Sequence, residues 1–253
     1  MTISVALAVR NEEGNLARCL ASVKEFASEI VVVDGGSTDM TVSIARDFGA
    51  KIKETDNPPI FHINKQKALD MCTGDWILQL DTDEVVSQDL TSELQNIASD
   101  PAAKAGYYLP RRNYFLGHWM RKGGQYPDYV IRFFRRGKGS FPAKSVHEQI
   151  TIDGDIGHVK APLDHYSYRT LGEYWRKART YIDLTAREMQ SRNEATGVLP
   201  IFTYTVVKPM STFLVLFLRH KGFVDHVYGF LFALFSALHH PLAYRAYLRM
   251  RDR

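Results

Sequence analysis

The sequence predicts an α/β fold in which helices cover both faces of a mostly parallel sheet, followed by an apolar, amphipathic helical segment near the C-terminal end. Two observations support this prediction. Short apolar runs alternate with amphipathic stretches over the first third of the chain, and hydrophobic residues dominate again beyond residue 198. The 253 residues, 45% of them hydrophobic and 24% charged, suffice for one sizeable core and exclude a disordered or collagen-like chain.

The predicted elements of the first third follow one another in a regular order. Apolar runs predict strands, and helical spacing predicts helices between them, over 3–9, 16–23, 30–33, 41–48, 50–53, 65–71 and 76–80. Strands that alternate with helices form parallel sheets, which bind ligands at the carboxyl ends of their strands. Functional residues are therefore expected in the segments that follow the strands.

The rest of the chain has a different pattern. A polar stretch predicts a helix over 85–105, aromatic runs broken by Gly and Pro predict strands and loops over 106–165, and charge-rich helical spacing predicts an amphipathic helix over 171–192. Two interrupted apolar runs follow at 198–218 and 223–238. A spanning helix needs about 20 predominantly apolar residues. The first run has marginal length and the second is too short, so we expect helices that lie in the membrane interface or re-enter it.

The positive charge gathers in the C-terminal segment. Residues 200–253 contain seven Lys and Arg against two Asp, whereas the remainder has 25 basic and 26 acidic residues. A basic, aromatic and apolar segment favours a membrane surface with anionic lipid over nucleic acid as the partner. The opening residues lack the basic region of a signal peptide, and Cys19 and Cys72 fit no zinc or disulfide pattern, so we expect a cytoplasmic location.

An acidic motif, Asp81-Thr82-Asp83-Glu84, directly follows one predicted strand. Two carboxylates at i and i+2, where the chain leaves a sheet, are able to face one cation. Mg²⁺ and Mn²⁺ prefer hard oxygen ligands and often bridge carboxylates and substrate phosphates. A solvated acidic turn has the same spacing, so the surrounding motifs decide between the two interpretations.

A second motif, VVVDGGSTD, places Asp34 at another strand end, followed by Gly35 and Gly36. Glycines let the backbone approach a ligand, and a carboxylate here suits a base N–H or ribose hydroxyls. A tight turn in which Ser37 or Thr38 caps the next helix explains the same residues without a ligand. The chain contains neither the glycine spacing of dinucleotide-binding folds nor a P-loop, which weakens both of those classes.

Three ordered motifs within residues 3–84 carry a family resemblance: LAVRNEEGNLARCLASV, IVVVDGGSTDMT and NKQKALDMCTGDWILQLDTDE. They resemble the family 2 inverting glycosyltransferases of the GT-A fold and look like the lipopolysaccharide core β-glucosyltransferase group. The resemblance implies a GT-A domain over 1–195, with a nucleotide-sugar half at 1–84 and an acceptor half at 85–170, and a membrane-associating segment over 196–253. It implies transfer of a hexose from a nucleotide diphosphate sugar, for which UDP-glucose is the preferred candidate. Together with the apolar C-terminal segment, it implies a lipid-linked glycan or lipopolysaccharide core acceptor at the cytoplasmic face of the inner membrane.

The resemblance also assigns roles to individual residues. It implies that the uracil and ribose of the donor meet residues of the first two motifs: Ala8, Arg10, Glu12, Asp34 and nearby Asp39. It makes Asp81 and Asp83 the pair that faces a divalent cation, Mn²⁺ or Mg²⁺, which neutralises the leaving diphosphate. Asp81 and Thr82 also belong to the donor site. Lys65 and Lys67 precede this strand and are expected to hold the diphosphate, although helical lysines are usually solvated.

An inverting transfer needs a general base near the acceptor hydroxyl. Asp128, in YPDYVIRFFRR, loosely resembles the family's acceptor-side motif, with Pro127 where the first acid usually stands. Glu148 is the second candidate. A histidine beyond the base binds metal in related enzymes, which favours Asp128 as the base and His147 as a metal ligand. Structural roles, such as an Asp128–Arg132 ion pair or a buried His147, remain as alternatives.

The acceptor side leaves further alternatives open. Arg132 is expected to meet a phosphate-bearing acceptor, unless it belongs to an ordinary exposed strand edge. A polyprenyl-phosphate glycosyltransferase would need little help from a general base. A non-catalytic GT-A scaffold of a polysaccharide assembly complex is the alternative outside the enzymes, and the intact Asp34, Asp81 and Asp83 argue against it.

Overall fold

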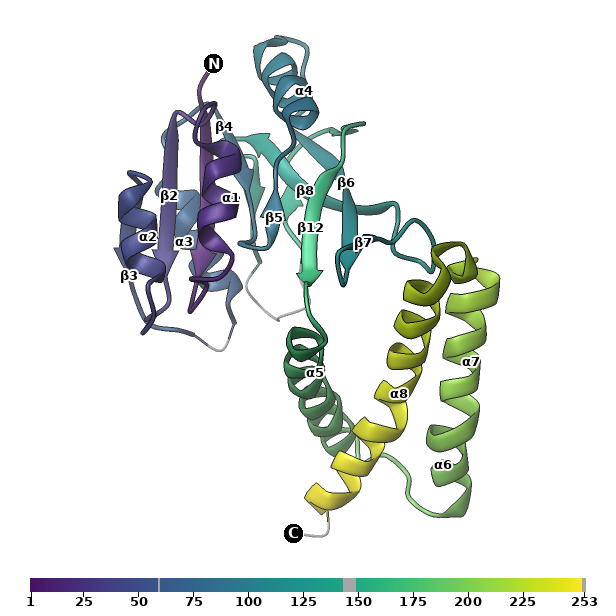
Figure 1. Ribbon diagram of the computed structural model, residues 1–253. Helices are drawn as coiled ribbons and strands as arrows, with labels where there is room; N and C mark the ends of the chain where they lie inside the picture. Colours follow the sequence, from purple (N-terminus) through teal and green to yellow (C-terminus); the bar gives the residue numbers. More distant parts are fainter. Residues whose placement is uncertain (59, 143–148, 252–253) are drawn as a thin grey trace. The chain divides into compact units, whose positions relative to one another are not determined.

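The computed structural model describes residues 1–58, 60–142 and 149–251 (Figure 1). Its first part reproduces the predicted alternation, with elements close to the predicted bounds: β1 (Ile3–Val9), α1 (Leu16–Val23), β2 (Glu29–Asp34), α2 (Thr41–Asp47), β3 (Lys51–Glu54), α3 (His62–Asp70) and β4 (Trp76–Gln79). The following part adds β5 (Glu84–Val85), α4 (Gln88–Ser99), β6 (Gly106–Phe115), β7 (His118–Trp119), β8 (Asp128–Arg135), β9 (Gly139–Ser140), β10 (Thr151–Ile152), β11 (Ile156–His158) and β12 (Leu163–Tyr168).

The chain divides into two compact units. The first comprises residues 1–111 and 129–165, and the second comprises residues 112–128 and 166–253. The second unit contains α5 (Leu171–Ser191), a long helix at Val198–Arg219 and α8 (His226–Arg251). Within the long helix, α6 (Val198–Phe202) and α7 (Lys208–Leu214) alternate with the π-helical turns η1 (Thr203–Val207) and η2 (Val215–Arg219), and the 3₁₀ turn η3 (Gly222–Asp225) precedes α8.

The sheet of the first unit combines parallel and antiparallel strands. Its order is β3-β2-β1-β4-β8-β6-β12-β5, and the four strands β1 to β4 pair in parallel. Strand β8 joins β4 in the antiparallel sense. Among the described residues, β9 and β10 form a separate pair.

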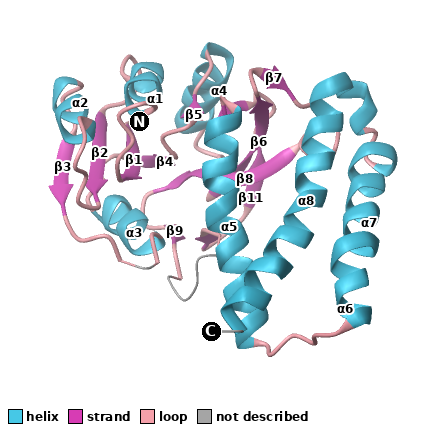
Figure 2. Cartoon of the chain, turned by 60° about the horizontal axis from the view of Figure 1, so that its bottom comes forward, coloured by secondary structure: helices cyan, strands magenta, loops and turns pink. Residues whose placement is uncertain are grey.

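Helices cover both faces of this sheet (Figure 2). Helices α1, α2 and α4 pack on Val5, Leu7 and Val32, which lie on one face. Helix α3 packs on the other face, against Ala6 and Val31. Because neighbouring strand residues point to opposite faces, two apolar layers need strands that are apolar on both faces, and β1 is apolar apart from Ser4. The predicted α/β class is confirmed.

The helix α8 is longer than its apolar run predicts. It continues through Pro241 to Arg251 and has 26 residues. Both the Val198–Arg219 helix and the Gly222–Arg251 segment are long and apolar enough to cross a membrane. The expectation that the second run is too short to span is therefore wrong. Beyond the proline, Ala243, Tyr244 and Tyr247 are buried in a cluster with residues of α5 and η1.

Glu29, at the start of β2, ties three strands of the first unit together. Its carboxylate accepts hydrogen bonds from Ser4, from Thr73 Oγ1 at 2.9 Å and from the Gly74 N–H at 3.3 Å, and it pairs with Lys51. Burial alone would raise the pKa of Glu29, but these donors outweigh it and lower the pKa to about 2. The ionised carboxylate therefore stabilises the fold.

We expect Glu29→Gln to flatten the pH dependence of stability in the acid range. A lowered pKa contributes stability that is fully present above the unfolded-state value and is lost as the pH falls from about 4.5 to about 2. Through this group the wild type should lose about 1–2 kcal/mol of its free energy of unfolding over that range, which is followed by the shift of the urea midpoint with pH. Glu25→Gln, at an exposed position, should behave like the wild type, and equal slopes for Glu29→Gln and the wild type would contradict the assignment.

Candidate active site

The carboxyl ends of β1, β2 and β4 meet at one edge of the sheet in the first unit. In the parallel register, Ala8 lies opposite Val33 and Val9 lies opposite Asp34. The Leu80 N–H, just beyond β4, donates to the Ala6 carbonyl at 3.0 Å. The segments that follow these strands are therefore neighbours, which is the arrangement that the sequence predicts for a ligand site.

Two of these segments are hydrogen-bonded to each other. The Asn11 N–H donates to Ser37 Oγ at 2.8 Å, and the Thr38 N–H donates to Asn11 Oδ1 at 2.8 Å. The Glu12 N–H donates to Thr41 Oγ1 at 2.7 Å. Asn11 has a left-handed backbone (φ 53°), which asparagine tolerates better than most residues. These bonds hold exposed Arg10 and half-buried Glu12 at the sheet edge. Asn11 was not among the predicted site residues, although an asparagine near the end of a strand indicates a turn.

Asp34 is almost fully buried, and its orientation is set by its own turn. Its Oδ2 accepts hydrogen bonds from the Gly36 N–H at 3.0 Å and the Ser37 N–H at 2.9 Å, and the Ser37 hydroxyl donates to Oδ1. Gly36 has a φ of 79°, which explains the second glycine of the motif. The Gly35 N–H donates to the Val9 carbonyl at 2.9 Å, so the turn also binds the end of β1.

Asp39 lies just before α2, whose N-cap residue is Met40 and not Ser37 or Thr38 as the sequence suggested. Asp39 Oδ1 accepts from the Thr41 N–H at 3.0 Å, and Oδ2 accepts from the Glu13 N–H at 3.2 Å. Desolvation would raise the pKa of Asp39, but the hydrogen bonds from Thr41 and Glu13 lower it below its usual value. Asp39 is therefore an anion that joins the first two motifs.

Asp81 lies between two cations that come from distant parts of the chain. Lys65 of α3 pairs with Oδ1, and Arg132 Nη2 of β8 lies 2.5 Å from Oδ2. Arg132 also donates to Glu84 Oε1, from Nη2 at 2.8 Å and Nε at 3.2 Å, and to Gln79. The Asp81 N–H donates to Glu84 Oε2 at 2.8 Å, which closes the network.

This network has strong electrostatic consequences. Glu84 is fully buried, and Arg132 and Lys65 are nearly so. Burial alone would raise the pKa of Asp81, but the charges of Arg132 and Lys65 outweigh it and hold that pKa well below its usual value. Arg132 is buried, so it is not part of an exposed strand edge, and it is not paired with Asp128 in the ion pairs that the structure describes. Its charge compensates Asp81 and Glu84.

Asp83 has a different neighbour. His165 Nε2, on β12, lies 3.5 Å from Asp83 Oδ1, and both side chains are 15% exposed. Thr82, between the two aspartates, is buried. The sequence analysis missed His165, because a single histidine in the run LDHYSY carries no spacing that relates it to the acidic motif.

The remaining predicted residues are distributed as follows. Lys67 Nζ donates to Thr55 Oγ1 at 2.9 Å and to Asn64 Oδ1 at 3.1 Å. The Thr55 N–H donates to the Asp34 carbonyl at 2.8 Å, so Lys67 lies near the Asp34 turn. Asp128 belongs to the second unit, where Asn113 Nδ2 donates to its Oδ2 at 3.2 Å. His147 and Glu148 lie outside the described residues.

Comparison with known proteins identifies the chain from its first unit. The family model described as glycosyl transferase family 2 matches residues 4–158, more than half of the chain. The chain belongs to glycosyl transferase family 2. The predicted family, the GT-A fold and the assignment to the glycosyltransferases are confirmed.

Relatives of this family 2 enzyme extend over most of its length. The lipopolysaccharide core biosynthesis glycosyltransferase LpsC of Rhizobium meliloti (strain 1021) is 29% identical and covers 94% of this chain and 91% of its own. An uncharacterised glycosyltransferase of Rickettsia typhi is 26% identical over 93% of this chain and 85% of its own. The crystal structure of S. aureus TarS 1–349 shares the fold, with a TM-score of 0.50 at 16% identity over 100% of this chain and 92% of that one; TarS 1–349 was also crystallised with UDP.

Proposed function

We propose that this glycosyltransferase transfers a hexose from a UDP-sugar, with inversion, to a lipid-linked or lipopolysaccharide core acceptor at the cytoplasmic face of the inner membrane. The observation that carries the proposal is the meeting of the Asp34 turn and the Asp81–Asp83 motif at one sheet edge. Oriented carboxylates for a nucleoside and a further carboxylate–histidine pair for a cation are the parts that such a donor needs. LpsC and the UDP complex of TarS support the acceptor class and the nucleotide.

The nucleoside would lie over the joined loops of the first two motifs. Two backbone N–H groups fix the direction of the Asp34 carboxylate, so it can accept hydrogen bonds from a ligand in one orientation. Ala8, Arg10, Glu12 and Asp39 border the same loops. We propose that Asp34 accepts hydrogen bonds from the nucleoside, with Lys67 of α3 toward the diphosphate.

The chemistry of the acidic motif favours Asp83 as the carboxylate that binds the cation. Both oxygens of Asp81 face Lys65 and Arg132, whereas Asp83 lies beside the imidazole of His165. Carboxylate oxygen and imidazole nitrogen both suit Mn²⁺. We therefore propose Asp83 and His165 as protein ligands, with His147 as a further candidate, and Asp81 as a positioning residue. The bound cation would neutralise charge on the leaving diphosphate.

The general base remains a choice between Asp128 and Glu148. We propose Asp128, whose carboxylate is oriented by Asn113, and the choice is testable with Asp128→Asn and Glu148→Gln. Loss of transfer in only one variant, with donor binding unchanged in both, identifies the base.

A calorimetric titration with UDP, GDP and dTDP in the presence of Mn²⁺ tests the nucleotide proposal. We expect UDP to bind most tightly and Asp34→Asn to weaken it about tenfold or more, because a charge-assisted hydrogen bond is lost. Tighter binding of another nucleotide would replace UDP in the proposal, and binding of none would contradict it.

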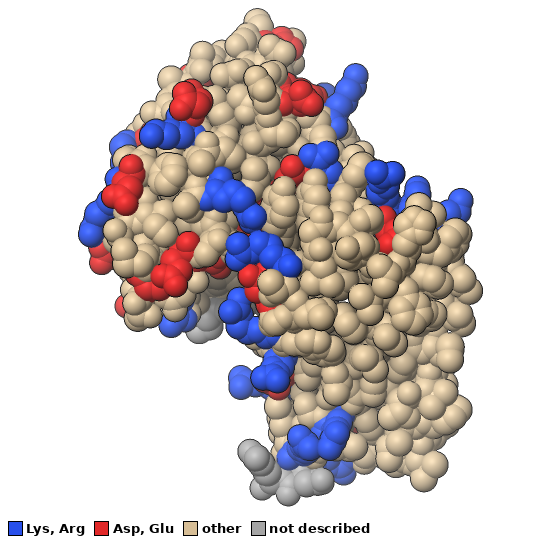
Figure 3. Space-filling model, viewed as in Figure 1, with Lys and Arg blue, Asp and Glu red and all other residues tan. Residues whose placement is uncertain are grey.

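The membrane surface is proposed to be the apolar side of the second unit. Only 6% of the apolar window in the Val198–Arg219 helix is buried, against 28% in the Gly222–Arg251 segment. The face over α6, α7 and α8 in Figure 3 carries few charges, and Lys and Arg side chains gather near α5. Such a large apolar face on a basic segment suits lipid.

Packing against α5 argues that α8 lies along the membrane surface and does not cross it. Helix α5 contacts α8 over most of its length, from Trp175 against Phe235 (5.3 Å between ring centroids) to Met189 in the cluster of Tyr244 and Tyr247. The outer side of α5 exposes four charged side chains, Arg176, Arg179, Asp183 and Arg187. A crossing α8 would carry them into hydrocarbon at about 2.5–3.5 kcal/mol for each charge near the centre. The proposed topology is therefore monotopic, with α5 toward water.

We expect Leu214→Glu to reduce flotation of the full chain with anionic phospholipid vesicles, about tenfold in partition coefficient, because it places a charge on the lipid-facing side. Leu184→Glu is the matched control. Both leucines are similarly exposed, 43% and 44%, but Leu184 lies on α5. Equal losses in both variants would contradict the orientation, and no loss in either would contradict membrane binding through this face.

A further inference from the structure

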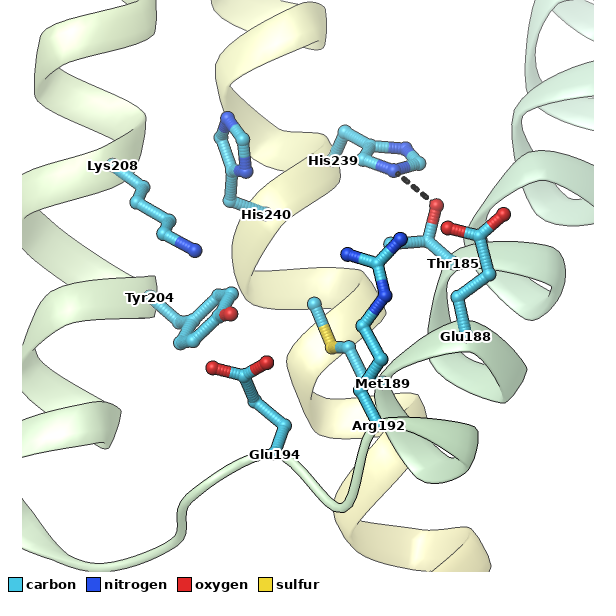
Figure 4. A pocket seen from close by; sticks show the side chains of 9 residues that line it. All are labelled: Thr185, Glu188, Met189, Arg192, Glu194, Tyr204, Lys208, His239 and His240. Atoms are coloured by element: carbon cyan, nitrogen blue, oxygen red, sulfur yellow. Dashed lines mark hydrogen bonds between the residues drawn. The ribbon is translucent and has the colours of Figure 1, made fainter. Parts of the chain in front are cut away.

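A polar pocket lies among the apolar helices of the second unit. It has a volume of about 280 Å³ and is bordered by α5, the Val198–Arg219 helix and α8 (Figure 4). Lys208 and Arg192 supply two cations, and Glu188 and Glu194 supply two carboxylates. None of these residues has a role in the proposed transfer reaction.

The floor of the pocket is aromatic and well packed. Tyr204 and Met189 are buried, and the Tyr204 ring stacks on Tyr244 with 4.5 Å between ring centroids. The Lys208 ammonium lies 3.6 Å from the centroid of the Tyr204 ring. A cation–π contact of this kind holds the ammonium in place without neutralising it.

Hydrogen bonds between the helices orient the two histidines at the pocket. His239 Nε2 lies 3.1 Å from Thr185 Oγ1 on α5, and His240 Nε2 lies 2.8 Å from Thr212 Oγ1 on α7. The three helices therefore meet at polar side chains in the middle of an otherwise apolar surface. Polar clusters in such surroundings are costly unless they bind something.

The two cations at the pocket are not neutralised by carboxylates in the described residues. Within the described part of the chain, neither Lys208 nor the guanidinium of Arg192 forms an ion pair or a side-chain hydrogen bond, and Figure 4 shows both directed into the pocket. Lys208 is half-buried and Arg192 is exposed, and a half-buried cation beside apolar surface favours an anion from outside the chain. With two carboxylates in the same pocket, however, the formal charge is zero when the histidines are neutral, so a polyanion is disfavoured.

We propose that this pocket binds the zwitterionic phosphodiester head group of a phospholipid. The phosphate would lie between Lys208 and Arg192, and the ammonium would lie toward Glu194. Exposed apolar side chains flank the pocket on both long helices, where the acyl chains would pack: Val207, Met210, Leu238 and Leu242. A single negative charge next to a single positive charge, attached to an apolar tail, matches each of these features.

Native mass spectrometry of the detergent-purified full chain tests the proposal with four probes: dioctanoyl phosphatidylethanolamine, dioctanoyl phosphatidylglycerol, dioctanoylglycerol and inorganic phosphate. We expect phosphatidylethanolamine to bind, and Lys208→Met or Arg192→Gln to weaken it about tenfold. Glu194→Gln should weaken phosphatidylethanolamine but not phosphatidylglycerol, which lacks the ammonium. Arg187→Gln, an exposed cation on α5 outside the pocket, should stay within about twofold of the wild type.

Three results would overturn the proposal. The first is unchanged binding of phosphatidylethanolamine in both Lys208→Met and Arg192→Gln. The second is binding of dioctanoylglycerol as tight as that of phosphatidylethanolamine. The third is displacement of the lipid by inorganic phosphate at the lipid's own concentration, which would indicate a site for free phosphate. The proposal rests on the membrane association proposed above only for access to lipid. Because the probes act in detergent and without donor or metal, its failure is distinguishable from failure of vesicle flotation or of transfer.

Discussion

Asp83→Asn is expected to lower kcat for donor turnover about 10³-fold. The cation proposed at Asp83 and His165 supplies several kcal/mol of charge stabilisation on the leaving diphosphate, and about 4 kcal/mol corresponds to this factor. The same variant should lose the Mn²⁺ dependence of UDP affinity, which is a readout independent of turnover. Asp83 is only partly buried, so the fold should persist.

The control for this substitution is Asp47→Asn, which removes a carboxylate from an exposed position at the end of α2. It should leave turnover and metal dependence unchanged. His165→Ala should reproduce part of the Asp83→Asn defect. Full Mn²⁺ dependence in both Asp83→Asn and His165→Ala would show that the cation binds elsewhere.

Arg132→Met is expected to destabilise the first unit by about 2–4 kcal/mol, because buried Glu84 loses its hydrogen-bonded counter-ion and keeps only the longer ion pair with Arg111 Nη1 at 3.8 Å. Glu84 has no exposed surface, and Asp81 would retain only Lys65 as a charged partner among the described ion pairs. Hydrogen exchange of β4 amides as a function of urea measures the effect within the first unit. Exchange that is unchanged from the wild type would contradict the role of Arg132.

A second substitution separates the lost charge from lost packing. Adding Glu84→Gln to Arg132→Met should restore about 1–3 kcal/mol, since the buried carboxylate that has lost its hydrogen bonds from Arg132 is removed while its shape is kept. Arg132→Lys keeps the charge but cannot form the forked contacts to Asp81, Glu84 and Gln79. Its stability should therefore lie between that of Arg132→Met and that of the wild type. A double variant no more stable than Arg132→Met would assign the loss to packing.

The strands and helices of the first unit were predictable because their information is local. The runs at 3–9 and 30–33 are apolar apart from Ser4, and Leu16, Cys19, Leu20 and Val23 repeat at helical spacing. The structure buries all of these residues except Ala8, which is half-buried. Parallel strands follow from the alternation of strands and helices, so the position of Asp34 and Asp81 at the same carboxyl-end edge of the sheet was also predictable.

The partners of Asp81 and Asp83 were not predictable, because they depend on long-range pairing. Arg132 meets Asp81 across 51 positions of sequence, and its direction depends on the antiparallel pairing of β8 with β4. His165 reaches Asp83 from β12, which pairs with β5. No residue spacing in a single sequence encodes either register. For the same reason, the continuation of α8 from residue 238 to Arg251 was not predicted, since its packing partners lie on other helices.

The most direct test of the central claim is release of nucleotide by the detergent-solubilised full chain with UDP-, GDP- and dTDP-sugars, with Mn²⁺ or with EDTA. We predict slow hydrolysis of one UDP-hexose, stimulated by a lipid-linked or lipopolysaccharide acceptor, lost with EDTA and lost in Asp83→Asn. Turnover that is unaffected by EDTA and by Asp83→Asn would contradict the cation site. A chain that neither turns over nor binds any of these nucleotides would contradict the transferase proposal and favour a non-catalytic scaffold.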